Sequence, residues 1–484
     1  MTTETKKITR RRFCELAGLG AVTLAMSPFS GEIAAGAPPG PPSRQPNFVF
    51  ILSDDQDWTG LSVQMDDRVP NSRSDFYRTP NLERLAAQGV RFSDAYAPSP
   101  VCSPTRYSLL TGKSPAQLHW TKAAPCMTPE DGFKLVPPRI ERSISDAETT
   151  IAEQLRTAGY ATAHYGKWHL SGGGPGRHGF DEHDGDTDNR HAAPFVDPNP
   201  VDIFGMTARA TAFMEKQSRA GRPFYVQLSH HALHYPENAR KATLAACRAR
   251  TPGRMHKDVE RAAITEDLDG GVGQLMEAID SLGITDNTYV IYMSDNGGGG
   301  RSRVRPIRGG KGSVWEGGIR VPLIVRGPRI PGNAFCHTPV VGWDLFPTFC
   351  ELAGITTLPK GLEGGSLARV LTDPDADRVT RSCDEIVWHF PHYQGEEGPH
   401  SAIRLGNFKL IRFYETGAVQ LFDLSQDLGE AHDLSLRMPE RAADLTQRLD
   451  NYLTSVGARM PSPNPRYDPE KPPQRQKRKG RRRK

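Results

Sequence analysis

The sequence lacks long hydrophobic runs. No stretch of about 18 or more apolar residues, the length that a membrane-spanning helix needs, occurs in the 484 residues. Apolar residues make up 37% and charged residues 24% of the chain, which is ordinary for globular proteins. We therefore expect no integral membrane segment, and the length is sufficient for one large α/β core with an appendage.

Cysteine is also scarce. The chain has seven cysteines and no Cys-x-x-Cys pair, which argues against a zinc ribbon and against a thioredoxin-like site. One or two disulfides are possible if the chain is exported, but a protein of this length does not need a disulfide framework to fold.

The net charge of +5 is unevenly distributed. Residues 471–484 carry nine Lys or Arg and no acid, and residues 1–37 carry five basic and three acidic side chains, which leaves about −6 for residues 38–470. The body is thus mildly acidic, and we expect no nucleic-acid partner for it. Residues 461–484 are predicted to form a disordered basic tail. Attachment of this tail to a polyanion, such as a sulfated glycan or a nucleic acid, is the alternative.

The N-terminus has the order of an export signal. Paired arginines precede Phe13, an apolar stretch covers Leu16–Met26, and small residues follow up to Ala37. This predicts a twin-arginine signal at residues 1–37, a Pro-rich leader at 38–46, and a bacterial protein exported to the periplasm or outside the cell by the twin-arginine machinery. An uncleaved anchor is the alternative, although Cys14–Met26 is short for a membrane span.

Short apolar runs that end in polar clusters indicate the fold. They do not alternate with polar residues, which is typical of strands buried on both faces of a parallel sheet. Helix-like segments lie between them, so the pattern predicts an α/β sandwich with functional groups beyond the carboxyl ends of the strands. The runs are Phe48–Leu52, Phe224–Leu228 and Tyr289–Met293, and the helical segments include Thr79–Gln88, Thr150–Thr157 and Leu268–Leu282.

The pattern changes after about residue 375. Ser401–Arg412 and Gln420–Leu424 are predicted as the strands of an antiparallel hairpin, and Pro439–Val456 as one closing amphipathic helix. We therefore expect a catalytic domain at residues 47–375 and a small C-terminal subdomain at residues 376–460.

Cys102 lies at the expected start of a helix. Ser103 is predicted to cap this helix, Pro104 to occupy its first turn and Gly112 to end it. Cys102 would then sit at the positive end of the helix dipole with Arg106 one turn along, a place that suits an anionic nucleophile or substrate. The alternative is that a lone cysteine simply packs in the core.

The segment from Cys102 to Gly112 resembles the signature of the formylglycine-dependent type I sulfatases, whose core is Cys-x-Pro-x-Arg followed by Leu-Thr-Gly. The resemblance implies that a separate maturation enzyme oxidises Cys102 to formylglycine (3-oxoalanine). It also implies the alkaline-phosphatase-like fold: a large, mostly parallel central sheet flanked by helices, with a small C-terminal antiparallel sheet and one helix. The implied activity is that of an arylsulfatase-like sulfuric ester hydrolase.

The resemblance extends to a metal site. Asp54 with Asp55, and Asp295 with Asn296, match the two pairs of ligands in this family, and residue 102 completes the set. An Asp-Asp pair alone is usually a solvated turn. Because all four side chains are oxygen donors, they suit one calcium ion, or magnesium as second choice.

Further positions match the residues that handle the sulfate group in this family. Lys167 and His169 lie in the second signature, where Ser171 replaces the usual Gly. Glu363 replaces an Asp at another motif, while His230 and His231 are interpreted as structural. The matched catalytic set is Cys102, Arg106, Lys167, His169, His234, Asp295 and Lys311.

The family scheme assigns a role to each of these groups. A hydroxyl of hydrated formylglycine, deprotonated by Asp295, attacks sulfur while His234, assisted by Lys311, protonates the leaving alcohol. His169 then takes the proton of the second hydroxyl so that the sulfated enzyme releases sulfate. Arg106 and Lys167 hold the diol in place.

Two other functions are compatible with parts of the sequence. A phosphate monoester, diester or phosphonate hydrolase on the same fold is the nearest alternative, and a non-catalytic polyanion-binding protein that uses the basic tail is another. Gly112-Lys113-Ser114 is not a P-loop, because Tyr107 stands where that motif needs Gly. A sulfated saccharide is preferred to an aryl sulfate as substrate, since arginines and aromatic residues accompany the site, namely Arg301, Arg303, Arg305, Arg308, Trp168, Trp315 and Tyr235.

Overall fold

The computed structural model describes residues 45–126, 128–299, 306–395 and 397–471. Its central element is an eight-stranded sheet built around β1 (Asn47–Ser53). β1 pairs in parallel with β7 (Phe224–Ser229) on one side and β8 (Thr288–Ser294) on the other. The three predicted apolar runs are therefore adjacent parallel strands, and this prediction is confirmed.

The sheet is mixed but mostly parallel. Its order is β10-β2-β9-β8-β1-β7-β5-β6, and β9 runs antiparallel to both of its neighbours. The other pairs in this sheet are parallel. The remaining strands of the sheet are β2 (Val90–Phe92), β5 (Ala161–Gly166), β6 (Glu182–His183), β9 (Leu323–Arg326) and β10 (Ala334–Cys336).

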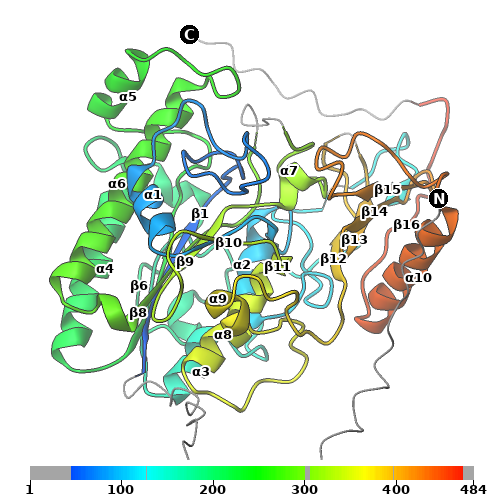
Figure 1. The fold of residues 1–484 in the computed structure, drawn as a ribbon. Helices are drawn as coiled ribbons and strands as arrows, with labels where there is room; N and C mark the ends of the chain where they lie inside the picture. Colours follow the sequence, from blue (N-terminus) through cyan, green and yellow to red (C-terminus); the bar gives the residue numbers. More distant parts are fainter. Residues whose placement is uncertain (1–44, 127, 300–305, 396, 472–484) are drawn as a thin grey trace, which may run out of the picture. The chain divides into compact units, whose positions relative to one another are not determined.

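Helices cover both faces of this sheet (Figure 1). Phe48, Phe50 and Leu52 of β1 point into one core, and Val49 and Ile51 point into the other, which explains why the run shows no polar alternation. One face is covered by α1 (Pro80–Ala87), α4 (Ile203–Arg219) and α6 (Val259–Ser281), and the opposite face by α2 (Cys102–Thr111), α3 (Ile151–Thr157), α8 (Leu345–Leu352) and α9 (Ala368–Thr372).

Smaller elements connect these layers. α5 (Lys241–Arg248) packs on α6, and α7 (Glu316–Ile319) precedes β9. β3 (Ala95–Tyr96) pairs with β11 (Val340–Val341), and β4 (Leu135–Val136) pairs with β16 (Ser462–Pro463). Short 3-10 helices lie at Pro175–His178, Asn189–Ala192, Pro200–Asp202, Thr285–Asn287 and Gly342–Asp344.

Local signals placed some helix ends correctly and others wrongly. Thr150 caps α3 in a capping box with Glu153, and Gly112 ends α2 with φ 68°. The prediction that Ser103 caps α2 is wrong. Val101 is the N-cap, and the buried Ser103 hydroxyl has no hydrogen-bond partner among the described residues, because the helix starts at Cys102, two residues before the expected Pro104.

The C-terminal part forms a separate four-stranded antiparallel sheet. Its order is β12 (Ile386–Phe390), β13 (His400–Leu405), β14 (Phe408–Phe413) and β15 (Val419–Asp423). The segment Ser401–Arg412, predicted as one strand, is two strands because the chain turns at Gly406, whose φ is 60°. α10 (Pro439–Ser455) packs on this sheet as predicted, with Pro439 in its first turn.

Residues 461–471, placed in the predicted tail, lie along residues 129–136. β16 pairs with β4, and Asn464 donates to the carbonyl of Phe133 at 2.8 Å. The predicted export signal and residues 472–484 lie outside the described residues. Within the described part, each of the six cysteines is a free thiol.

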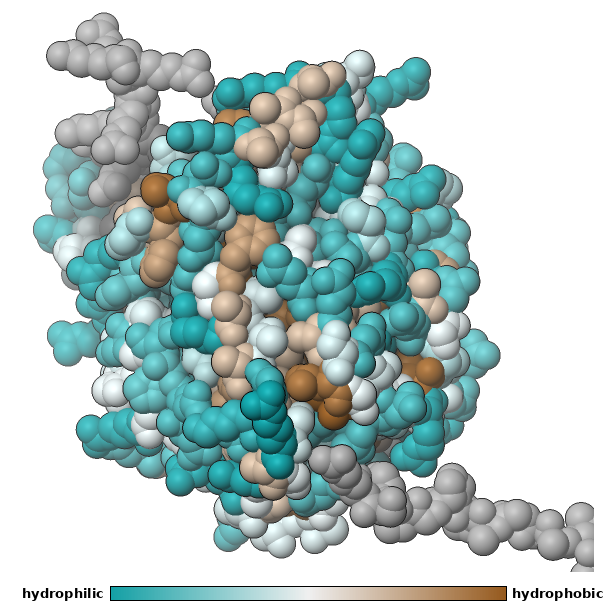
Figure 2. Space-filling view, turned by 90° about the vertical axis from the view of Figure 1, so that its left-hand side faces the viewer, coloured by the Kyte–Doolittle hydropathy of each residue, from teal (hydrophilic) through white to brown (hydrophobic). Residues whose placement is uncertain are grey.

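The described helices include none that combines the length and apolar character of a membrane span. Figure 2 shows the side of the molecule that α4, α5 and α6 cover. Hydrophilic residues dominate this face, and the apolar ones form small separate groups.

Candidate active site

The carboxyl ends of β1 and β8 bring two pairs of oxygen donors together. Ser53 is in register with Ser294, so Asp54 and Asp55 follow one strand where Asp295 and Asn296 follow its neighbour. The Asp55 backbone amide donates to Asp295 Oδ1 at 3.2 Å, and Asn296 Nδ2 donates to Asp55 Oδ1 at 2.8 Å. All four residues are buried. The structure thus brings together side chains that lie 240 positions apart in the chain.

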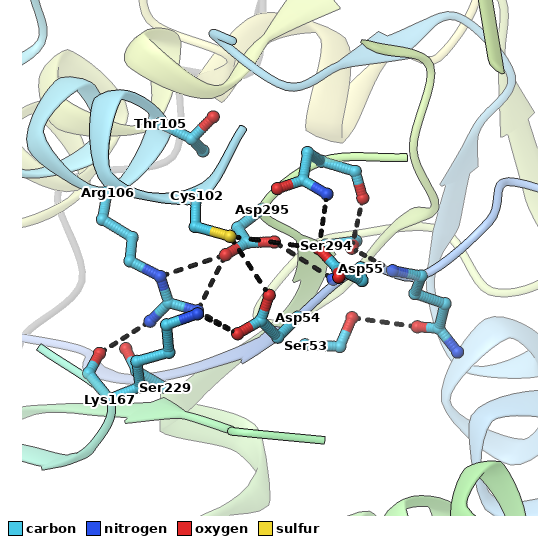
Figure 3. A network of polar contacts seen from close by, with 12 residues as sticks. Ser53, Asp54, Asp55, Cys102, Thr105, Arg106, Lys167, Ser229, Ser294 and Asp295 are labelled. Atoms are coloured by element: carbon cyan, nitrogen blue, oxygen red, sulfur yellow. Dashed lines mark hydrogen bonds and ion pairs between the residues drawn. The ribbon is translucent and has the colours of Figure 1, made fainter. Parts of the chain in front are cut away.

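Cys102 faces this acidic cluster from the first position of α2 (Figure 3). Its Sγ lies 3.4 Å from Asp54 Oδ1 and 3.9 Å from Asp55 Oδ1, and the residue is 1% exposed. The positive end of α2 is therefore directed at the group that faces the carboxylates.

Three cations surround the cluster. The Arg106 guanidinium donates to Asp295 Oδ2 at 2.8 and 3.0 Å and to the Lys167 carbonyl at 2.6 Å. The Lys167 ammonium pairs with Asp54 Oδ2 (Figure 3). Lys311 Nζ lies 2.6 Å from Asp55 Oδ1 and 3.2 Å from Cys102 Sγ. Three buried carboxylates are thus matched by three cations, an arrangement that an anionic ligand can enter without meeting net negative charge.

The backbone after β5 needs unusual conformations to place Lys167 and His169. Gly166 has φ 90°, and a Cβ there would lie 2.3 Å from the Ser229 carbonyl oxygen. His169 and Ser171 also adopt left-handed conformations, with φ 60° and 53°. The usual Gly at position 171 of the family motif therefore has a conformational reason, and serine accepts the same conformation at a cost.

Two histidines flank the cluster. Burial, together with Lys167 and Arg106, lowers the pKa of His169 to about 2, so its ring is neutral. Its Nδ1 is buried without a hydrogen-bond partner among the described residues. Burial also lowers the pKa of His234, partly opposed by the Asp54 carboxylate. The neutral His169 ring can therefore accept a proton.

His231 is a residue of this region to which the sequence gave no role. It is 4% exposed, and burial with Lys167 lowers its pKa to about 3. It shares a small hollow with His234, Tyr235 and Asn189. Three histidines within five residues of the sequence indicate a functional loop. Only the structure shows that His231 and His234, and not His230, line the small hollow.

The electrostatics of the cluster differ between its members. Burial raises the pKa of Asp54, but Lys167, His234 and Arg106 together bring it well below its usual range. Burial and the Asp295 and Asp54 carboxylates raise the pKa of the Cys102 thiol. An unmodified Cys102 is therefore a neutral thiol at neutral pH and not a thiolate nucleophile.

The donor set fits a hard cation. One oxygen from each of Asp54, Asp55 and Asp295 and the Cys102 sulfur all lie within 4.8 Å of one another. Asn296 Oδ1 is buried and has no hydrogen-bond donor in the part of the chain that the structure describes. Calcium and magnesium prefer such carboxylate and amide oxygens.

Not every residue expected near the substrate is where the sequence placed it. Arg301, Arg303 and Arg305 lie outside the described residues. Arg308 stacks on Trp315, 3.7 Å from the ring centroid, and donates to the Glu430 carbonyl, while Trp168 and Trp315 are buried. Tyr235 is 72% exposed beside His234 and is available to a ligand.

A mixed α/β sheet whose carboxyl edge carries three buried carboxylates and three cations suits the binding and hydrolysis of an anionic ester. Comparison with known proteins specifies the class. The sulfatase family model matches residues 46–355, and a model described as N-sulphoglucosamine sulphohydrolase, C-terminal, matches residues 310–458. The chain belongs to the sulfatase family and is an enzyme that hydrolyses sulfate esters.

Individual relatives support this assignment. A sulfatase of Formosa agariphila is 29% identical, over 85% of this chain and 88% of its own length. The N-acetylgalactosamine-6-sulfatase of the dog, Canis lupus familiaris, is 32% identical over 67% of this chain and 65% of its own length. The crystal structure of Ps i-CgsB with k-i-k-neocarrahexaose superposes with a TM-score of 0.70 at 25% identity, covering 85% of this chain and 93% of that one. The predicted family and fold are confirmed.

Proposed function

We propose that the protein is an exported sulfatase of sulfated saccharides that uses formylglycine at position 102 beside one calcium ion. The observation that carries this proposal is the position of Cys102 Sγ, which lies within 4 Å of Asp54, Asp55 and Lys311. Residues 47–375 would form the catalytic domain and residues 376–460 the C-terminal subdomain.

The state of the Cys102 thiol supports its modification. A neutral thiol that donates toward a carboxylate is a poor nucleophile for an anionic sulfate ester. Formylglycine, when hydrated, supplies a geminal diol, so that one hydroxyl can attack while the other later allows sulfate to leave. We infer that the maturation enzyme acts before folding is complete, because residue 102 is 1% exposed in the folded chain.

Asp54, Asp55, Asp295 and Asn296 would hold the cation, together with residue 102. Asn296 Oδ1, buried without a donor among the described residues, supports this assignment. When bound, calcium supplies positive charge that polarises the nucleophilic oxygen and the sulfate group.

The charged and titratable side chains of the site would transfer protons and stabilise negative charge. Asp295, whose pKa burial and the Asp54 carboxylate raise, would accept the proton of the attacking hydroxyl. Lys311 and Arg106 would stabilise negative charge around residue 102. An incoming sulfate anion favours the protonated form of His234, which would then protonate the leaving alcohol. The neutral ring of His169 would take the second proton, while Lys167 holds the diol.

A sulfated saccharide is the proposed substrate class. Similar proteins include the named N-acetylgalactosamine-6-sulfatase and Ps i-CgsB, whose structure contains k-i-k-neocarrahexaose. The exposed Tyr235 ring beside His234 is placed to contact a sugar next to the scissile sulfate. Export by the twin-arginine route would bring the enzyme to extracellular polymers.

A sulfatase and a phosphatase differ in which ester they hydrolyse faster. We expect the purified protein to release sulfate from at least one member of a panel of defined sulfated saccharides, and to hydrolyse nitrophenyl sulfate at least a hundredfold faster than nitrophenyl phosphate. Ion chromatography of released sulfate measures the first, and nitrophenol absorbance the second. Faster hydrolysis of the phosphate would instead favour the phosphate ester or phosphonate hydrolase.

Binding of the cation should raise the free energy of unfolding. After removal of divalent ions with a chelator, calcium titrated to about one hundred times its dissociation constant should stabilise the folded protein by about 2.7 kcal/mol. Thermal unfolding monitored by fluorescence measures the shift, and elemental analysis gives the bound ion. Asn296→Ala should need more calcium for the same shift, because it removes one neutral oxygen ligand. Asn451→Ala, an exposed change on α10, is the control.

A further inference from the structure

One hollow in the described part of the molecule lies outside the candidate active site. It has a volume of about 710 Å³ and opens between the loop that follows β1 and the segment that follows α5. In Figure 1 this blue loop lies above the carboxyl edge of the sheet, on the side of α5. The catalytic scheme uses none of its lining residues.

The walls of the hollow are fixed to each other. The Asp75 carboxylate accepts hydrogen bonds from the backbone amides of Arg254, Met255 and His256 at 2.6 to 2.9 Å. Phe76 and Tyr77, the next two residues, are buried. These hydrogen bonds and the buried aromatic side chains hold the two segments that line the hollow in a fixed relative position.

Its unpaired charged groups are cationic. Arg73 and Arg78 line the hollow and are exposed, and neither has a carboxylate partner among the described residues. The acids of the lining are engaged: Asp75 with three backbone amides, and Glu83 with the Ser62 hydroxyl. Unpaired guanidinium groups suit a sulfated sugar, since the guanidinium fork binds the sulfate anion.

The loop that forms one wall of the hollow begins at the proposed cation ligands, since Asp54 and Asp55 directly follow β1. Arg261 donates to the backbone carbonyls of Asp55 and Leu233, so it braces both the proposed cation loop and the loop of His234. Burial raises the pKa of Tyr77 in the lining, and the Arg261 guanidinium opposes this rise. The hollow and the site therefore share one loop at the carboxyl edge of the sheet.

We propose that this hollow is an accessory subsite for a sulfated sugar unit of the substrate other than the one that is desulfated. The proposal rests on the proposed function. It makes the enzyme selective for oligosaccharides that carry more than one sulfate, with Arg73 and Arg78 as specificity-determining residues.

The double variant Arg73→Ala/Arg78→Ala tests this subsite. With multiply sulfated hexasaccharides of carrageenan and chondroitin sulfate as probes, we expect KM to rise at least tenfold, with kcat changed by less than about twofold. Turnover of nitrophenyl sulfate, which is too small to reach the hollow, should stay within about twofold of the unchanged protein. Arg378→Ala/Arg437→Ala removes two exposed arginines of the C-terminal part, which also lack a carboxylate partner among the described residues, and should alter neither substrate.

A direct binding measurement separates this proposal from the catalytic one. Fluorescence anisotropy of a labelled hexasaccharide should show a dissociation constant at least tenfold higher for the double variant, whether or not the probe is cleaved. Equal dissociation constants would overturn the subsite and leave the proposed function intact. If the double variant loses affinity but the unchanged protein releases no sulfate from the hexasaccharide, the result would support the subsite and refute the proposed substrate class.

Discussion

Cys102→Ala is expected to lower sulfate release at least a thousandfold while the protein still folds. The change removes only the sulfur of a residue whose oxidised form is proposed as the nucleophile, and loss of a covalent nucleophile typically costs three to six orders of magnitude in kcat. Initial rates on nitrophenyl sulfate measure the effect, and circular dichroism checks the fold. Peptide mass spectrometry of the active, exported protein should detect formylglycine at residue 102.

Cys102→Ser distinguishes a diol from an ordinary hydroxyl. Serine can attack sulfur but has no second hydroxyl with which to expel sulfate, so we expect a trapped sulfated protein or a loss of turnover. Intact mass spectrometry detects the added sulfate group. Cys383→Ser, a thiol of the C-terminal part outside the acidic cluster, should keep full activity. Undiminished turnover by Cys102→Ser, or an unmodified thiol in active protein, would refute the assigned role.

Much of the fold could be predicted because short sequence patterns indicate which segments form buried strands and which form helices. Runs such as Phe48–Leu52 are apolar on both faces, which only a covered sheet can bury. α6 is longer than predicted: it begins at Val259, whereas its apolar pattern suggested Leu268. Its first turns bury the charged residues Arg261 and Asp267, whose partners lie outside the helix. Because these residues are not apolar, hydrophobic periodicity does not indicate that the first turns are helical.

The site was predicted through family motifs more than through periodicity. Asp54 and Asp295 could be placed at strand ends, but their proximity depends on the register of β1 with β8, which the sequence does not state. The bracing of both site loops by Arg261 likewise depends on tertiary contacts. The substitution of Glu for Asp at position 363 has a structural use, because Glu363 accepts from the Ser114 amide and from the Tyr452 hydroxyl of α10.

A buried ion network joins the Lys311 loop to the C-terminal sheet. Lys409 of β14 lies 2.7 Å from Glu316 Oε1 and 2.8 Å from Glu430 Oε1, and the three side chains are fully buried. Glu316 starts α7, five residues after Lys311, and its backbone amide donates to Glu430 Oε2 at 2.7 Å. The network therefore fixes the backbone that carries a proposed catalytic lysine.

Lys409→Met should destabilise the fold by about 3 to 5 kcal/mol at pH 8, because it leaves two buried carboxylates without their shared cation. Burial already raises the pKa of Glu430, opposed by Lys409, whereas Lys409 and Arg320 bring the pKa of Glu316 below its usual value. Without Lys409 both pKa values rise, and at Glu430, whose pKa is already above its unfolded value, the folded variant holds a proton that the unfolded chain releases. Its stability should then increase as the pH falls, and the deficit should shrink between pH 8 and pH 5.5.

Urea denaturation of both proteins at the two pH values measures this difference. Lys360→Met, an exposed lysine without an ion pair among the described residues, should change stability by less than about 0.5 kcal/mol. Adding Glu430→Gln to Lys409→Met should recover part of the loss at pH 8 and weaken its pH dependence, since one buried charge is then removed. A deficit that is independent of pH would show that lost packing, rather than the two carboxylates, causes the destabilisation, and the network would then have no electrostatic role in holding the Lys311 loop.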